Sequence, residues 1–267
     1  MSKHEPRPSD EVVQAIAGDI LSMAAYTPRP QEDGPRDLAL AYATQDALVA
    51  HLLARKALGP VAGYKIAANA PALMKRFGVT EPASGRVFAK QRHASPAVLP
   101  ASGFRQFAYE PEIAAVIGSD LPAREAPHST ERVVAAIARF VPALELLDLR
   151  GAEMEAIHLP DIVAQNITNA GAVIGGPGIT PDQLNADAIR TTVEIDGVSE
   201  LSVIGAAPQP PLEAVAWLAN HLAARGLSLE AGQIVLCGTH APIRYVRGPA
   251  TITAEMQTLG SVTLRLE

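Results

Sequence analysis

The stretch FAYEPEIAAVIGSDLP, residues 107–122, places two glutamates one residue apart at the start of an apolar run. Side chains of a β-strand alternate between its two faces, so Glu110 and Glu112 would share one face. Because both faces are apolar beyond the glutamates, the stretch predicts a buried strand that directs two carboxylates to one side. The alternative is an edge strand whose glutamates face water and whose Pro111 needs no N–H.

A third acid, Glu145, lies in VPALELLDLR, a stretch of mostly apolar residues. A buried carboxylate without a partner is strongly unfavourable, so a partner is expected. That partner is either an arginine such as Arg150 or a cation shared with Glu110 and Glu112. Three clustered carboxylates repel one another unless a divalent cation neutralises them. Oxygen ligands alone favour a hard ion, Mg²⁺ before Mn²⁺ or Ca²⁺.

Four further polar residues are candidates for the same site. Lys65, in the apolar stretch GYKIA, either extends from a strand end to solvent or transfers protons and holds a substrate anion. Asn166 and Thr168, in DIVAQNITNAGAVIGG, are candidates for binding substrate oxygens, with turn formation as the alternative. His240, in CGTHAPIRY, follows a strand and a glycine and is a third candidate for substrate binding, although taken alone it is more typical of a surface histidine.

The composition excludes several classes of protein. The 267 residues are enough for one large domain, and 48% hydrophobic with 19% charged residues is typical of folded proteins. The formal net charge of −6 argues against nucleic acid or an anionic membrane as a partner. The sequence shows neither an apolar stretch as long as a membrane span nor the apolar core of a signal peptide. A single cysteine, Cys237, favours the reducing cytoplasm and is expected to be a buried core thiol.

Patterns along the chain predict an α+β fold in two parts. Residues 1–60 form a helical N-terminal portion, with two helices separated by the proline- and glycine-rich residues 27–37. Residues 61–267 form a β-rich catalytic body. The expected strands of this body cover residues 61–67, 107–118, 143–149, 170–176, 191–198 and 233–239 and a hairpin over 250–267, and its expected helices cover residues 71–78, 129–140 and 210–226.

Five collinear blocks of the sequence resemble the 2-keto-4-pentenoate hydratase group of the fumarylacetoacetate hydrolase superfamily. The blocks are GYKIAANAPALMKRFGVTEPASGRVFA, YEPEIAAVIGSDLP, VPALELLDLR, DIVAQNITNAGAVIGG and PLEAVAWLANHLAARGLSLEAGQIVLCGT. The resemblance runs from about residue 38 to the C-terminus. It implies a mixed β-roll or barrel-like body with a helical N-terminal portion, and assembly into a homo-oligomer.

The resemblance also implies roles for individual residues. The family's E-x-E pair and a third downstream acid hold Mg²⁺ or Mn²⁺, and they correspond to Glu110, Glu112 and Glu145. The catalytic strand lysine corresponds to Lys65, and Thr168 stands where these enzymes carry a small hydroxyl residue near the substrate. The implied reaction, a step in aromatic compound catabolism, is hydration of a small 2-hydroxy-2,4-dienoate to a 4-hydroxy-2-oxo acid through an enolate that the metal stabilises.

Two departures from the family pattern leave other reactions open. Similar hydratases carry an aspartate, for proton transfer or for orienting the lysine, where this chain has Ala83 beside Ser84. The loop at His240 also differs from the expected small-residue loop. The nearest alternative is decarboxylation of 2-oxo-3-hexenedioate (4-oxalocrotonate), which would form the same enolate by losing CO₂. Hydrolysis or tautomerisation of another 2-oxo acid, and a non-catalytic oxo-acid binder, are the remaining alternatives.

Overall fold

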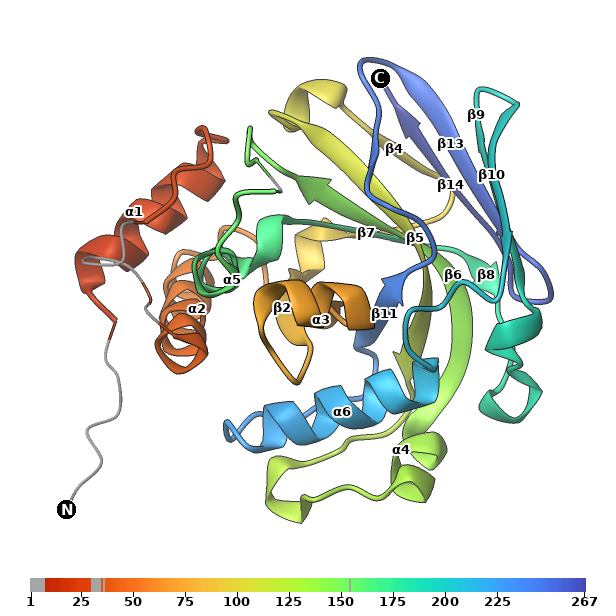
Figure 1. Cartoon of the computed structure of the whole chain (residues 1–267), viewed down its shortest axis with the longest axis horizontal. Helices are drawn as coiled ribbons and strands as arrows, with labels where there is room; N and C mark the ends of the chain where they lie inside the picture. Colours follow the sequence, from red (N-terminus) through yellow and green to blue (C-terminus); the bar gives the residue numbers. More distant parts are fainter. Residues whose placement is uncertain (1–7, 30–34, 36, 154) are drawn as a thin grey trace.

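The computed structural model describes residues 8–29, 35, 37–153 and 155–267. Two β-sheets form the body of the molecule, and helices cover it on several sides (Figure 1). The two N-terminal helices and α5 lie on one side, and the smaller sheet lies on the other. The α+β class predicted from the sequence is therefore confirmed.

The larger sheet has eight strands, with β5 and β6 near its centre. Its strands in spatial order are β2 (Ala83–Phe88), β1 (Val61–Ala67), β11 (Ile234–Thr239), β5 (Phe107–Ile117), β6 (Ile137–Asp148), β7 (Asn169–Ile174) and β3 (Arg92–Ala94), with the short β12 (Arg244–Tyr245) beside β5. The pairs β1–β11 and β3–β7 are parallel and the others are antiparallel.

The smaller sheet has six strands and contains the predicted C-terminal hairpin. In spatial order it consists of β10 (Val198–Ile204), β9 (Arg190–Ile195), β13 (Ala250–Met256), β14 (Gly260–Leu266) and β4 (Ala97–Leu99), with β8 (Gly176–Pro177) paired to β14. Apolar side chains from one face of β5 and β6, among them Tyr109, Leu144 and Leu146, pack against this sheet.

The larger sheet is rolled so that its two ends approach each other. Val87 of β2 and Ala172 of β7, which are not hydrogen-bonded neighbours, belong to one buried cluster with Ala114, Val141 and Leu236. This cluster fills the concave side of the roll. The hydrogen-bonded order of the described strands is open, so the sheet is not a closed barrel.

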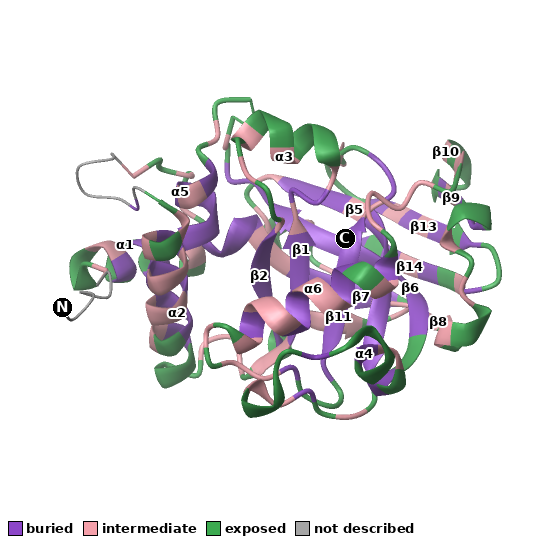
Figure 2. Ribbon diagram, turned by 60° about the horizontal axis from the view of Figure 1, so that its bottom comes forward, coloured by how far each residue is buried: buried purple, intermediate pink, exposed green. Residues whose placement is uncertain are grey.

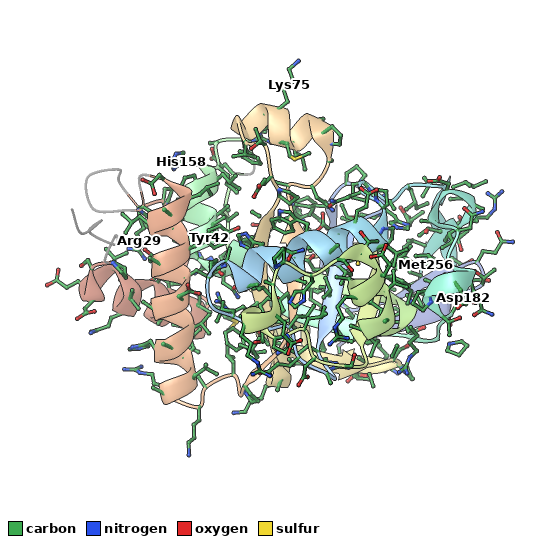
Figure 3. The ribbon with its side chains drawn as sticks, turned by 90° about the horizontal axis from the view of Figure 1, so that it is seen from below. Arg29, Tyr42, Lys75, His158, Asp182 and Met256 are labelled. Atoms are coloured by element: carbon green, nitrogen blue, oxygen red, sulfur yellow. The ribbon has the colours of Figure 1, made fainter. Side chains whose placement is uncertain are left out.

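The helices are α1 (Asp10–Leu21), α2 (Leu38–Ala54), α3 (Pro71–Phe77), α4 (Thr130–Ala136), α5 (Leu159–Ala164) and α6 (Pro211–Ala223). Helix α6 packs its apolar face on the convex side of the sheet, and the strands beneath it are coloured as buried in Figure 2. Helix α3 buries none of its residues, and its Lys75 extends away from the body (Figure 3). None of the helices in the described ranges is long and apolar enough to cross a membrane.

Both prolines of the central strands lie where a neighbouring strand ends. Pro111 accepts a hydrogen bond from His240 N, 2.9 Å away, in the gap between β11 and β12. Pro142 accepts one from Gly175 N at 2.8 Å, directly after the end of β7. The missing N–H groups therefore interrupt no regular ladder, and the edge-strand alternative for β5 was wrong because β5 has neighbours on both sides.

One predicted helix is shorter than expected. The helix predicted over residues 129–140 ends at Ala136, and strand β6 begins at Ile137 and continues through Pro142. The helical spacing of apolar residues persists beyond Ala136, but pairing with β5 along eleven register positions outweighs it. The elements that were not predicted include β2, β10 and α5.

The N-terminal helices form where the sequence predicts them. Residues 30–34 and 36, within the predicted separating segment, lie outside the described residues. The division into a helical portion, 1–60, and a β-rich body, 61–267, stays a prediction.

Candidate metal centre

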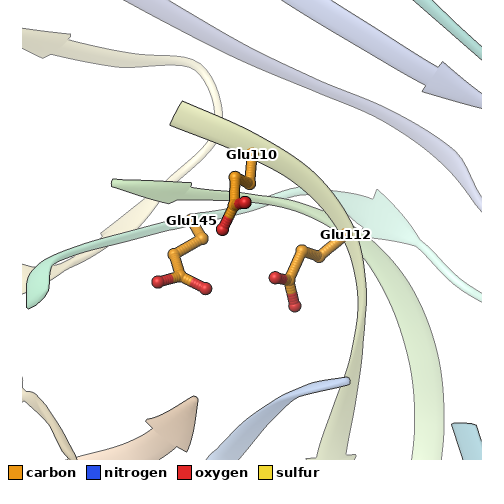
Figure 4. A group of neighbouring side chains, drawn as sticks. All are labelled: Glu110, Glu112 and Glu145. Carbon is orange, nitrogen blue, oxygen red and sulfur yellow. The ribbon is translucent and has the colours of Figure 1, made fainter. Parts of the chain in front are cut away.

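Three carboxylates meet on the concave side of the rolled sheet. Glu110 and Glu145 face each other across the β5–β6 ladder, and Glu112 follows two residues along β5 on the same face. One carboxylate oxygen from each lies within 4.8 Å of the others, and the three side chains point into a common space (Figure 4). Glu112 and Glu145 are each only 1% exposed. The prediction that Glu110 and Glu112 share one face of a strand is therefore confirmed.

Burial and mutual repulsion make it unfavourable for all three carboxylates to be ionised without a cation. Burial, followed by the negative charge of Glu145, raises the pKa of Glu110 to about 8, although nearby Lys65 opposes this shift. Burial raises the pKa of Glu112 well above its usual range, and the charges of Glu145 and Glu110 add to the effect. Near neutral pH the cluster therefore holds either protons or a cation.

Two groups of the protein partly compensate the negative charge. Lys65, 2% exposed, forms an ion pair with Glu145 and donates a hydrogen bond to the Ile167 carbonyl oxygen at 2.9 Å. The backbone N–H of Gly238 donates to Glu112 Oε2 at 2.8 Å. The positive charge of one ammonium and the hydrogen bond of one N–H do not neutralise three carboxylates. The three carboxylate oxygens are therefore suitable ligands for a divalent cation.

The ligand chemistry restricts the kind of cation. The cluster offers carboxylate oxygens alone, and the nearby thiol of Cys237 is buried, with burial raising its pKa far above the usual range. Oxygen ligands of this kind suit a hard cation such as Mg²⁺ or Ca²⁺ rather than a thiolate-seeking metal. Three protein ligands also leave coordination positions for water or substrate.

Residues 63–267 match the family described as fumarylacetoacetate (FAA) hydrolase C-terminal. The chain belongs to this family. A 2-keto-4-pentenoate hydratase from Burkholderia vietnamiensis is 33% identical over 255 residues, covering 91% of this chain and 95% of the relative.

The solved structure of 4-oxalocrotonate decarboxylase from Pseudomonas putida G7, complexed with magnesium and adipate, is also similar to this member of the FAA hydrolase family. It has a TM-score of 0.85 and 26% identity, and the match covers 97% of this chain and 98% of that chain. The same enzyme complexed with calcium and acetate gives a TM-score of 0.84. Both structures contain the class of hard divalent cation that the carboxylate cluster fits.

The structure brings four of the predicted site residues together. The three glutamates and Lys65 lie on the concave side of the sheet, and the partner of Glu145 is Lys65 rather than Arg150. Arg150 instead donates to the side chain of Gln165 at 3.1 Å. Lys65 does not extend to solvent.

Asn166 is next to this group, but its side chain is engaged with the backbone. Its amide makes two hydrogen bonds to Arg86 of β2, at 2.7 and 2.9 Å. Thr168 is 5% exposed and borders a cavity of about 200 Å³ that is also lined by Arg150 and Gln165. The substrate-binding roles of Asn166 and Thr168 stay predictions.

The ring of His240 faces the smaller sheet. Its Nδ1 is 2.8 Å from Thr191 Oγ1 of β9. Its ring is buried, and this burial lowers its pKa to about 4. This geometry does not support substrate binding by His240, which stays a prediction.

Three residues near the centre were missed by the sequence interpretation. Gly238, with a φ of 116°, presents its N–H to Glu112, and Asn69 donates to the Cys237 carbonyl oxygen beside it at 2.9 Å. Gly85 pairs with Lys65 across the β1–β2 ladder. The only signal in the sequence for Gly85 and Gly238 was that each lies at the end of a strand or within one. A glycine in such a place often marks where another backbone or a ligand comes close to the strand.

Proposed function

We propose that this protein is a divalent-cation-dependent hydratase that adds water to a 2-hydroxy-2,4-dienoate such as 2-hydroxypenta-2,4-dienoate. The observation that carries the proposal is the cluster of Glu110, Glu112 and Glu145, the last two buried, with buried Lys65 paired to it. Its support among known proteins is the family membership and the 2-keto-4-pentenoate hydratase that matches over nine-tenths of the chain.

The residues present define what the site can do. Glu110, Glu112 and Glu145 would hold the cation, for which we propose Mg²⁺, with Mn²⁺ as the alternative. A bound cation supplies Lewis-acid polarisation of the substrate's 2-oxo and carboxylate oxygens. Lys65 lies against this cluster with its ammonium fixed by Ile167 and Glu145, so it can hold the anionic substrate or move a proton.

The reaction balances as addition of one water. The C2 hydroxyl of the dienol loses its proton, C5 and C3 each gain a proton, and C4 gains hydroxide, giving 4-hydroxy-2-oxopentanoate. We assign to Lys65 a proton transfer in this sequence or the stabilisation of the substrate's charge. Ala83 lies opposite Ala67 on β1, two residues from the Lys65–Gly85 pair, and offers no proton of its own.

A second candidate, which the lack of an acid at Ala83 leaves open, is decarboxylation of 2-oxo-3-hexenedioate to give the same dienol and CO₂. The similar decarboxylase structure, which contains the dicarboxylate adipate, supports this candidate. We further propose a homo-oligomer in the cytoplasm. This expectation rests on the family resemblance and on the single, buried Cys237.

The deciding experiment follows the ultraviolet absorbance of 2-hydroxypenta-2,4-dienoate with purified protein, with Mg²⁺ and again with EDTA. We expect Mg²⁺-dependent loss of the dienol above the rate of spontaneous ketonisation, with 4-hydroxy-2-oxopentanoate as the product. Lys65→Met, which keeps the length of the side chain without its charge, should be slower by about 10²–10⁴-fold.

A rate equal to spontaneous ketonisation would contradict the hydratase. Mg²⁺-dependent release of CO₂ from 2-oxo-3-hexenedioate would then identify the decarboxylase.

A further inference from the structure

Residues Asn166–Thr168 form a turn that side chains normally disfavour. Their φ angles are 58°, 51° and 50°, so three consecutive residues adopt the left-handed conformation. For L-residues this region crowds Cβ against the backbone, and a β-branched residue such as Ile167 is especially unsuited to it. Such a turn persists only where surrounding contacts enforce it.

The side chain of Asn166 connects this turn to a neighbouring strand. Its Oδ1 accepts from Arg86 N at 2.7 Å and its Nδ2 donates to Arg86 O at 2.9 Å. Strand β2 lies at the end of the larger sheet, so this amide occupies the place that a further strand would take. Both hydrogen-bonding groups at Arg86 are thereby satisfied, and both ends of the amide are used.

This left-handed turn also contacts the ammonium of Lys65. The carbonyl oxygen of Ile167 accepts from Lys65 Nζ at 2.9 Å, and the same ammonium forms the ion pair with Glu145. Gly85 leaves room for this arrangement: a Cβ there would lie 3.2 Å from Asn166 Oδ1 and 3.2 Å from Lys65 Cγ. The turn, β2 and the lysine are therefore packed directly against one another.

We propose that Asn166 is a positioning residue rather than a substrate ligand. Its amide fastens the left-handed turn to β2, and the turn fixes the Ile167 carbonyl on Lys65, which keeps the ammonium beside the carboxylate cluster. The kinetic part of the test rests on the proposed function, whereas the chemical labelling part does not.

The test compares Asn166→Ala with Asn220→Ala. Asn220 holds the His128 backbone in the same way, accepting from His128 N at 2.8 Å and donating to His128 O at 3.1 Å, but on α6, where it contacts neither Lys65 nor the glutamates. Both variants lose the pair of hydrogen bonds to one backbone residue, and Asn220→Ala also loses a hydrogen bond to the Ala216 carbonyl oxygen at 3.0 Å, so the control is at least as disruptive. The control therefore separates a general loss of stability from a specific effect on Lys65.

The first measurement is the rate at which an amine-reactive ester acylates Lys65 in the folded protein, followed by peptide mass spectrometry with exposed Lys75 as the internal reference. We expect Lys65 to react faster in Asn166→Ala than in wild type and unchanged in Asn220→Ala. The second measurement is steady-state kinetics. We expect kcat of Asn166→Ala to fall about 100-fold, as misplacement of a reacting group by 1 Å can cause, with KM unchanged.

Two results would overturn the proposal. A raised KM with unchanged kcat would make Asn166 a substrate ligand, and unchanged labelling with unchanged kcat would leave it a purely structural residue. If Asn166→Ala does not fold, Gly85→Ala serves instead, because its added Cβ displaces the turn or Lys65 while every hydrogen-bonding group remains. Unchanged Lys65 labelling in folded Gly85→Ala would equally overturn the proposal.

Discussion

Glu112 links the carboxylate cluster to the neighbouring strand. Its Oε2 accepts the Gly238 N–H, and its carboxyl group lies beside those of Glu110 and Glu145. Burial already raises its pKa, so the isolated charge is unfavourable in the folded protein. A neutral side chain of the same shape should therefore preserve the fold and remove the cation.

We expect Glu112→Gln to lower Mg²⁺ affinity by more than about 100-fold. Changing a residue that only hydrogen-bonds to a metal ligand costs up to about that much, and changing the ligand itself should cost more. The amide oxygen can still accept from Gly238, so the free energy of unfolding without metal should not decrease. Titration calorimetry measures the affinity and urea unfolding measures the stability. Glu255→Gln, on the exposed side of β13, is the control, and wild-type Mg²⁺ affinity in Glu112→Gln would refute the assignment.

His240 should make stability depend on pH. Burial lowers its pKa from 6.5 to about 4, so below pH 6.5 the unfolded chain binds a proton that the folded protein excludes. Its contribution to stability is therefore complete above pH 6.5 and is lost as pH falls toward 4. The slope is at most about 1.4 kcal/mol per pH unit.

The measurement is the free energy of unfolding of wild type and His240→Asn between pH 7 and 4.5. The free energy of unfolding of wild type, relative to that of His240→Asn, should fall as the pH is lowered from 7 to 4.5. The raised pKa of Glu110 acts with the opposite sign, but it is present in both proteins and cancels in the difference. Parallel curves for the two proteins would show that His240 binds a proton as readily in the folded protein as in the unfolded chain.

At the level of elements, strands marked by an apolar run were predictable and long-range competition was not. Strand β5 (Phe107–Ile117) was predicted over residues 107–118 from the sequence alone, including which side chains share a face, because the two-residue period of a strand is local information. The end of helix α4 was misplaced because β6 forms only when β5 is available to pair with it. Strand β2 was missed because its sequence, ASGRVF, contains no continuous apolar run and is interrupted by glycine and arginine.

In the candidate site, too, local features could be predicted and features that depend on long-range contacts could not. Glu110, Glu112, Glu145 and Lys65 could be named because a charged residue in an apolar strand is visible in the sequence. The N–H of Gly238 and the left-handed turn were invisible, since backbone groups and φ angles depend on tertiary contacts. Asn166 was named, but its partner, the Arg86 backbone, is 80 residues away in the chain.

At the scale of the whole molecule, the N-terminal helices are tied to the sheet by both apolar and charged contacts. Phe88 of β2 belongs to one buried cluster with residues of α1 and α2, including Ile16 and Leu48. Asp46 of α2 pairs with Arg86 of β2 and with Arg225, which follows α6. Contacts of this kind predict that the helices unfold together with the body.

We therefore expect one unfolding transition for the entire chain. Trp217 of α6 stacks on His221, whose ring lies 4.8 Å from Tyr42 of α2, so its fluorescence reports on the junction between helices and body. Thermal melting followed by this fluorescence and by far-ultraviolet circular dichroism should give the same midpoint. Deleting residues 1–60 should prevent folding, because Phe88 would lose its cover. Two separated transitions, or a folded 61–267 fragment, would show instead that the helical portion is an independent unit.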